Sequence, residues 1–320
     1  MTSIGKALRY AARRRDLIIS YGLALILLIV SGLITSTGLQ PNRILTIFGQ
    51  NAPLGVAAIG QTFVLLSGGL DLSVGAVINL SNVIVSEVMD GQNGRIPLAV
   101  VVTLLVAALV GLINGVLVAK AKLNPLLTTL AVGTVVQGVY FAYTGGQPTG
   151  SIAPAFRVVS NGRIGDFLPW SFVAWLLLWA VTAFLLYRTV FGRRFYAVGA
   201  NEKAAWISGI SSSWYIVSAY VASAVCAGLA GLLLSSYIGR ASIGVGDPYT
   251  LISIAAVVIG GTAFTGGVGG LAGTFAGVVV MVFIATILST LNIPTAAQFV
   301  TQGIVIASMM LLYNRIGHGR

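Results

Sequence analysis

Histidine and cysteine are almost absent from this chain of 320 residues. The one histidine, His318, lies near the end of the sequence, so the apolar segments contain no imidazole for a metal site, a catalytic triad or a general base. The one cysteine, Cys226, excludes an intrachain disulfide framework, and its position in an apolar run predicts a buried, inert thiol. The phosphate-binding pattern G-x-x-x-x-G-K-[ST] is also missing. The sequence therefore predicts no enzyme active site.

Charged residues are also scarce for a chain of this length. They make up 8% of the sequence against 57% hydrophobic residues, and the mean hydropathy of +0.97 is far above that of an ordinary soluble domain. We therefore expect an all-α, polytopic transmembrane helical bundle. The 40 glycines suit such a bundle, because small residues let membrane helices approach closely. The net charge of +11 does not indicate nucleic acid, since the basic residues cluster at predicted membrane edges.

Ten apolar segments approach the ~20 residues that cross a bilayer. They lie at 17–37, 44–66, 73–90, 97–119, 125–144, 170–188, 214–238, 250–265, 271–291 and 296–313. The first is too long for a signal-peptide core and is expected to remain as a membrane anchor. With both termini inside, only Arg43, Arg95, Arg157, Arg163 and Arg240 of the 18 basic residues lie outside. The positive-inside rule therefore predicts cytoplasmic termini.

The whole chain, 1–320, is expected to form a single transmembrane domain with three polar segments. Residues 1–16 form a basic cytoplasmic N-terminus. Residues 145–169 contain several glycines and prolines and are expected to form an irregular external loop with short interfacial turns. Residues 189–213 are internal and basic, and within them Asn201 is expected to cap a short helix from Lys203 to Ile207.

Only one of the seven acidic residues lies well inside the apolar pattern. This residue, Asp71, belongs to a glycine-rich break at 68–75, and a proton-coupled or sodium-coupled carrier normally has more intramembrane acids. Because Asp71 and Ser73 directly precede an apolar run that starts at Val74, helix capping is the favoured interpretation. A direct role in a pathway or gate, and a contact with a partner subunit, are the alternatives.

Neutral polar side chains in the spans are further candidates for a solute path. The candidates for the pathway or its gate, with the glycine-rich break included, are Gln61, Gly68, Gly69, Asp71, Ser73, Asn79, Asn114, Thr128, Thr129, Gln137, Gln298 and Gln302. Buried amides and hydroxyls in membrane bundles more often join helices than line a path. A neutral lining would suit a neutral, polyhydroxylated solute better than an ion.

A weak internal repeat connects two parts of the chain. Gly68, Gly69 and Leu70 align with a second Gly-Gly-Leu at 269–271, and paired glycine-interrupted segments are typical of duplicated transporters. In a chain so rich in glycine, chance alone can produce such matches. The glycines at 266–270 are themselves expected to form a tight reversal between the eighth and ninth spans.

Three long motifs follow one another along the chain. They are AIGQTFVLLSGGLDLSVGAV at 58–77, FGRRFYAVGANEKAAWISGI at 191–210 and IAAVVIGGTAFTGGVGGLAG at 254–273. In this order and spacing, and over nearly the whole chain, they resemble the permease subunits of bacterial carbohydrate ABC importers of the ribose, xylose and galactofuranose type. The family pattern differs at Ala200, Trp206 and Val268, where relatives often have glycine, a basic residue and a charged residue, so some contacts to the ATPase are expected to differ.

The resemblance implies a ten-span transport subunit in the bacterial cytoplasmic (inner) membrane. It implies as partners a second permease copy or paralogue, a cytoplasmic ATP-binding subunit and a periplasmic or lipid-anchored solute-binding protein. ATP and magnesium would bind to the ATPase subunits, and this chain would hold no cofactor and no metal. The ATPase-coupling residues would be Arg193, Arg194, Gly199, Asn201, Glu202, Lys203 and Gly209. ATP binding would press this segment and drive alternating access.

The resemblance also favours a substrate class. The Leu-Asp-Leu-Ser core at 70–73 favours a monosaccharide or a similar neutral solute. A permease for nucleosides or branched-chain amino acids is the nearest alternative, and a self-sufficient secondary carrier or channel is a different class. Which sugar is carried is not predicted, because selectivity largely belongs to the binding protein.

Overall fold

The computed structural model describes residues 15–34, 39–294, 296–298, 300–301, 303–304 and 308. Most of this part is helical, which confirms the all-α membrane class. Six of its helical stretches are long and apolar enough to cross a membrane, namely Leu17–Ile34, Asn93–Ala119, Pro125–Thr144, Trp170–Arg188, Ser212–Ile238 and Leu271–Thr290. Residues 1–14, predicted as a basic N-terminus, and most of the predicted span 296–313 lie outside the described residues.

The helices and strands are as follows, in order along the chain. They are α2 (Arg15–Ile34), α3 (Pro41–Gln50), α4 (Ala52–Leu66), α5 (Val74–Met89), η1 (Asn93–Arg95), α6 (Ile96–Ala119), α7 (Pro125–Thr144), α8 (Pro154–Asn161), β1 (Arg163–Ile164), β2 (Leu168–Pro169), α9 (Trp170–Arg188), α10 (Val190–Ala200), α11 (Glu202–Ile207), α12 (Ser212–Ile238), α13 (Asp247–Ile259) and α14 (Leu271–Thr290).

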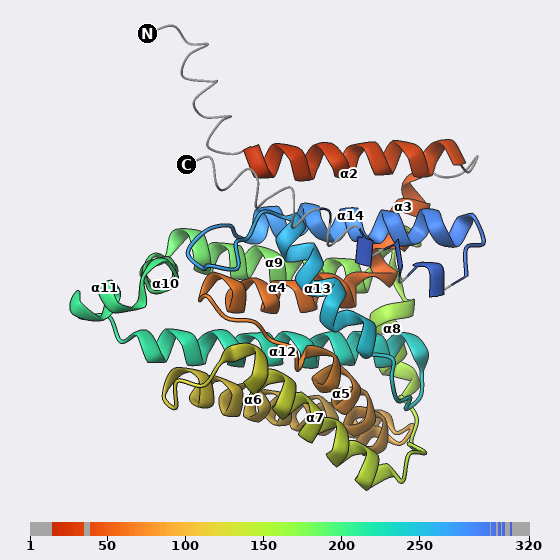
Figure 1. Cartoon of the computed structure of the whole chain (residues 1–320). Helices are drawn as coiled ribbons and strands as arrows, with labels where there is room; N and C mark the ends of the chain where they lie inside the picture. The colour runs from red at the N-terminus through yellow and green to blue at the C-terminus, as the bar shows by residue number, and fades with distance from the viewer. Residues whose placement is uncertain are drawn as a thin grey trace, which may run out of the picture.

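Helix α12 lies at the centre of the bundle and packs against α4, α5 and α6 (Figure 1). Helix α14 packs against α2 and α13 on one side of it, and α7 lies against α5 and α6 on the other. Glycines allow these close contacts: a Cβ on Gly111 of α6 would lie 2.6 Å from the carbonyl oxygen of Tyr220 in α12, and one on Gly60 of α4 would lie 2.8 Å from the Cα of Ser223. Backbones therefore approach where a larger residue would hold the helices apart.

Two predicted spans differ from the structure. The segment 44–66 is two helices, α3 and α4, separated at Asn51. Pro53 explains the break, because a proline has no N–H to donate and its ring clashes with the carbonyl four residues earlier. The predicted span 250–265 begins as α13 at Asp247 and ends at Ile259, because Gly261 takes a φ of 84°, which a helix cannot continue.

The polar segments lie at opposite ends of the bundle (Figure 1). The segment 145–169 is more ordered than predicted, because it contains α8 and the antiparallel hairpin of β1 and β2. The segment 189–213 contains α11, as predicted, and also α10, which was not predicted. The glycines at 266, 267, 269 and 270 all have positive φ and form the expected reversal.

The proposed repeat stays a prediction. Under the alignment of the two Gly-Gly-Leu sequences, the last residue of α13 falls opposite Ala58 inside α4, and the first residue of α14 falls opposite Leu70 in a loop. The helix boundaries of the two halves therefore do not coincide.

Candidate functional site

The glycine-rich break at residues 67–73, which we call the Asp71 loop, leaves α4 through a tight C-terminal cap. Gly68 has a φ of +81°. Its N–H donates to the Leu65 carbonyl at 2.9 Å, and the N–H of Gly69 donates to the Val64 carbonyl at 3.0 Å. This pair of bonds is the Schellman motif, which needs a left-handed residue after the helix and therefore favours glycine there. The chain then turns toward α5.

The carboxyl group of Asp71 is buried and accepts three hydrogen bonds. Its Oδ1 accepts the N–H of Ser73 at 2.9 Å and the Ser73 hydroxyl at 2.6 Å, and its Oδ2 accepts the Ser223 hydroxyl of α12 at 2.7 Å. Asn114 of α6 adds a bond from its Nδ2 to the Ser73 Oγ at 2.9 Å. The carboxyl group thus joins the start of α5 to α12 and, through Ser73, to α6.

The predicted capping role of Asp71 needs a correction. Ser73 is the residue before α5, and Asp71 binds the N–H of Ser73 itself rather than an N–H inside the first turn of the helix. In that first turn, the N–H of Gly75 is bound by the Thr250 hydroxyl of α13 at 2.9 Å. Asp71 therefore closes an Asx turn that shapes the entry into α5, and a hydroxyl from another helix satisfies the Gly75 N–H in the first turn.

Helices α7 and α12 hold the same loop from other sides. The N–H of Leu72 donates to the Thr129 hydroxyl of α7 at 3.0 Å. The Tyr220 hydroxyl of α12 donates to the Leu70 carbonyl at 3.4 Å. Irregular backbone in a membrane protein needs such partners, because lipid provides none. The loop is therefore a packed junction rather than an open segment.

At the end of α4, where the Asp71 loop begins, the chain meets α10 and the glycine-rich reversal at 266–270 backbone to backbone. The N–H of Gly267 donates to the Leu66 carbonyl at 2.9 Å. A Cβ on Gly199 of α10 would lie 1.8 Å from the carbonyl oxygen of Leu66 and 2.8 Å from the nitrogen of Gly267. We call this meeting of Leu66, Gly199 and Gly267 the three-backbone contact. The hydroxyl of Tyr196 in α10 reinforces it with a 2.9 Å bond to the Gly269 carbonyl.

Helix α11 projects from this end of the bundle (Figure 1). As predicted, Asn201 caps it: its Oδ1 accepts the N–H of Ala204 at 2.9 Å. Trp206 and Ile207 are 70% and 71% exposed, so a short, anchored helix presents two large apolar side chains outward. Exposed apolar residues on a projecting element indicate a surface for another protein.

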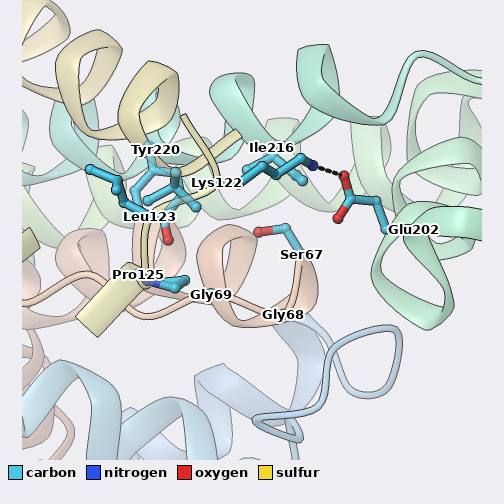
Figure 2. A pocket seen from close by; sticks show the side chains of 10 residues that line it. Ser67, Gly68, Gly69, Lys122, Leu123, Pro125, Glu202, Ile216 and Tyr220 are labelled. Atoms are coloured by element: carbon cyan, nitrogen blue, oxygen red, sulfur yellow. Dashed lines mark hydrogen bonds and ion pairs between the residues drawn. The ribbon is translucent and has the colours of Figure 1, made fainter. Parts of the chain in front are cut away.

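A cavity of about 220 Å³ lies between α11, the turn from α6 to α7, and the Asp71 loop. Figure 2 shows Gly68, Gly69 and Tyr220 on one part of its wall and Lys122 and Glu202 on another. The Lys122 Nζ and the Glu202 Oε1 lie 2.5 Å apart and form an ion pair, although both side chains remain about half exposed. The cavity therefore connects the projecting helix with the loop that holds Asp71.

Other residues predicted for the pathway make their contacts outside the Asp71 loop. The Nδ2 of Asn79 donates to the Asp247 carboxyl at 2.7 Å, and its Oδ1 accepts the Gly246 N–H at 2.7 Å, so this amide anchors the start of α13. The hydroxyl of Thr128 bonds the Asn124 carbonyl within α7. Asn79 therefore joins α5 to the start of α13, whereas the bond of Thr128 stays within its own helix and its N-cap.

Four glutamines were predicted for the pathway, and they occupy different environments. Gln61 is fully buried in α4, and neither amide atom has a partner among the described residues. Gln137 is exposed on α7. The Nε2 of Gln298 donates to the Ile293 carbonyl at 2.9 Å, and Gln302 lies outside the described residues.

The remaining predicted coupling residues lie on α10, on α11 and just after it. Arg193 and Arg194 of α10 and Lys203 of α11 are exposed. Gly209 has a φ of +79° and makes the turn after α11. These positions leave the basic side chains available to another molecule.

Sequence reasoning missed Ser223, Tyr220 and Thr250, which bind the Asp71 loop or the start of α5. They are isolated polar groups in long apolar stretches, and the Ser223 contact joins residues 152 positions apart. No local pattern indicates such a pairing. Lys122 was counted as a cytoplasmic charge, but nothing in the sequence indicated that it contacts Glu202.

The sequence of the chain matches a family described as "Branched-chain amino acid transport system / permease component" over residues 43–313. The ribose import permease protein RbsC of Bacillus subtilis (strain 168) is 39% identical over 289 residues, which cover 90% of this chain and 89% of that protein. The L-arabinose ABC transporter permease protein AraH of Azospirillum brasilense is 33% identical, with 83% and 78% covered. The D-allose transport system permease protein AlsC of Escherichia coli (strain K12) is 31% identical, with 90% and 89% covered. No solved structure matches the chain.

Proposed function

This chain belongs to the family of branched-chain amino acid transport system permease components, and from that premise we propose that it is the membrane-spanning permease subunit of an ABC importer for a monosaccharide or a similar neutral polyhydroxylated solute. The observation that carries the proposal is the projecting α10–α11 segment, whose Gly199 meets Leu66, the residue just before the Asp71 loop, backbone to backbone. A transport subunit driven by a separate ATPase needs such a path from its surface to its interior.

The relatives support the sugar class over the alternatives. Proteins that match this chain over most of their length are named as permeases for ribose, L-arabinose and D-allose. The description of the family mentions branched-chain amino acids, so that substrate class and nucleosides remain the competitors to test. The buried polar groups of the described residues are mainly amides and hydroxyls, which suit a neutral solute.

The mechanism follows from the arrangement of α10 and α11. A cytoplasmic ATP-binding subunit would dock on Trp206, Ile207 and the exposed basic residues around them. Closure of the ATPase pair would move α10 and α11 as a unit, and the three-backbone contact would carry the movement to the Asp71 loop. Since this loop binds α6, α7 and α12, the displacement would reach the helices that must rearrange for alternating access.

The proposed topology has ten spans, with the α11 end and both termini in the cytoplasm. The distribution of basic residues supports it, because with the α11 end inside only Arg43, Arg95, Arg157, Arg163 and Arg240 of the 18 basic residues lie outside. The complete importer would contain a second permease copy or paralogue, the ATP-binding subunit and a solute-binding protein that docks at the α8 end. It would lie in the bacterial inner membrane, with ATP and magnesium held by the ATPase subunits alone.

Reconstitution in liposomes tests the proposal. The chain would be reconstituted alone and with its ATP-binding and solute-binding partners, and uptake of radiolabelled D-ribose, D-galactose, L-arabinose and D-allose would be measured with and without ATP. We expect ATP-dependent uptake of at least one sugar by the complete complex only. Uptake by the isolated chain would refute the importer, and ATP-driven uptake of leucine or a nucleoside in place of sugars would refute the substrate class.

A further inference from the structure

A second cavity, of about 510 Å³, opens where the second span is broken. It lies between α3, which ends just before Asn51, and the last two turns of α14. Arg163 of β1 donates to the Thr46 hydroxyl in its wall at 2.7 Å, which places the cavity toward the β-hairpin, at the end opposite to α11. A membrane helix interrupted beside a polar cavity is a pattern that accompanies solute sites in transporters.

The wall of this cavity is polar although both helices are membrane elements. Its lining includes the side chains of Thr46, Gln50, Asn51, Thr286, Ser289 and Thr290. Hydroxyls and amides that face a cavity beside membrane helices need water or a solute for the hydrogen bonds that the protein does not supply, because lipid offers none. Their concentration on the facing sides of α3 and α14 therefore indicates an aqueous vestibule rather than a lipid-filled groove.

The bonds already made in the wall show which ligand atoms suit it. The Thr286 hydroxyl donates to the Val282 carbonyl at 2.7 Å, and the Thr290 hydroxyl donates to the Thr286 carbonyl at 2.9 Å. The Asn51 Nδ2 donates to the Ile47 carbonyl at 2.8 Å. Each of these groups has thus used a donor on the helix and keeps oxygen lone pairs that can accept from a ligand. A ligand rich in O–H donors complements such a surface.

The charge of the residues that line the cavity further limits the class of ligand. Among the described residues that line the cavity none is acidic, and the charged one is Arg43. A cation therefore has no carboxylate to bind there. The cavity is also larger than a few waters require, and comparable in volume to pockets that take small organic ligands.

We propose that this cavity, the α3–α14 vestibule, is a binding site for the hydroxyl groups of the transported sugar on the entry side of the permease. The inference rests on the proposed function and deepens it, because it assigns part of the sugar recognition to this chain rather than to the binding protein alone. The vestibule receives the solute at the break in the second span, and its acceptor groups replace water around the sugar hydroxyls.

The single cysteine of the chain makes the first test direct. In a Cys226→Ser background, Ser289→Cys would place one thiol in the vestibule, and Val280→Cys, which replaces a fully buried residue of the same helix, is the matched control. The reconstituted complex would be treated with a membrane-impermeant maleimide from the entry side, with each of the four sugars or with betaine at equal osmolality. We expect the cysteine at 289 to react, the one at 280 to stay unlabelled, and the transported sugar to slow the reaction.

Two results of the labelling experiment would overturn the proposal. If the cysteine at 289 does not react from the entry side, the cavity is not aqueous. If it reacts but the transported sugar slows it no more than betaine does, the cavity holds water without recognising sugar. Protection by one of the sugars in a complex that transports none of them would support the site and refute the proposed function instead.

Transport kinetics give a second measurement. If the residues of the wall had a purely structural role, their replacement would leave the KM for uptake unchanged. Gln50→Leu and Thr286→Val each remove one polar group of the wall, and each is expected to raise the KM for uptake about fivefold, the value of one hydrogen bond. Thr103→Val, which removes a buried hydroxyl of α6 that bonds its own helix, is the control. A KM equal to that of the wild type in both vestibule variants would overturn the proposal.

Discussion

Replacement of Asp71 separates its hydrogen bonding from its charge. Asp71→Leu removes all three bonds that the carboxyl group accepts from Ser73 and Ser223. Asp71→Asn keeps an oxygen that can accept from Ser73, and its amide NH₂ can donate to the Ser223 hydroxyl. If hydrogen bonding in the Asx turn is what the residue provides, the two variants will differ widely in stability.

The expected loss of stability in each variant follows from the hydrogen-bonding groups that it leaves without a partner. In Asp71→Leu the buried N–H of Ser73 cannot turn to another acceptor, which costs about 1–3 kcal/mol, and each of the two lost hydroxyl bonds adds about 1 kcal/mol. We therefore expect Asp71→Leu to lower the free energy of unfolding by about 4 kcal/mol. Asp71→Asn loses only the extra strength of bonds to a carboxylate, about 1 kcal/mol.

Thermal unfolding of the purified protein in detergent measures this difference, with transport by the complete complex as the second readout. Asp90→Asn, which neutralises an exposed acid, is the control. Equal losses of Tm in Asp71→Leu and Asp71→Asn would refute the hydrogen-bonding argument. Loss of transport in Asp71→Asn at a nearly unchanged Tm would show that the charge itself takes part in transport, contrary to our interpretation.

Three further changes test the α10–α11 segment. In Gly199→Ala the new methyl group would overlap the Leu66 carbonyl, so we expect a loss of about 1–3 kcal/mol of stability and weaker coupling, measured as sugar uptake per ATP hydrolysed; full coupling at unchanged Tm would contradict it. Asn201→Ala removes the cap of α11 and is expected to cost about 1 kcal/mol locally, seen as faster amide hydrogen exchange in α11 and nowhere else. The exposed Lys122–Glu202 pair contributes only about 0.2–1 kcal/mol, so Glu202→Arg should leave membrane insertion intact but reduce substrate-stimulated ATP hydrolysis, and the exchanged pair Lys122→Glu with Glu202→Lys should restore it. Unchanged hydrolysis in Glu202→Arg would count against the role of this pair.

The long helices could be predicted from the sequence because local signals mark both of their ends. Helix α7 begins with a proline after Asn124, whose Oδ1 accepts the N–H of Leu126 at 3.0 Å, and it ends at Gly145 with a φ of +58°. These signals act within a few residues, so they are visible without any tertiary contact. The cap of α11 by Asn201 was predicted for the same reason.

The rest depends on contacts between distant parts of the chain. Helix α10 was missed because its aromatic residues pack on α12, where Phe191 lies 5.4 Å from Tyr215 between ring centroids. The break at Asn51 was missed because hydropathy averaged over a whole span hides the local stop signal of Gln50, Asn51 and Pro53. For the site, the sequence identified Asp71, Ser73 and Asn114 as candidates but not the bonds that join them or the partner Ser223. Hydropathy measures which residues enter the membrane, and it carries no information on which polar groups meet there.

The three-backbone contact has a mechanical consequence. A side chain at an interface behaves as a compliant element, because it can change rotamer and absorb a small displacement before its neighbour moves. Leu66, Gly199 and Gly267 meet through main-chain atoms, which have no rotamers to yield. A small shift of α10 is therefore transmitted to Leu66 and Gly267 without being absorbed by a change of rotamer. Displacements too small to change a rotamer still reach the Asp71 loop.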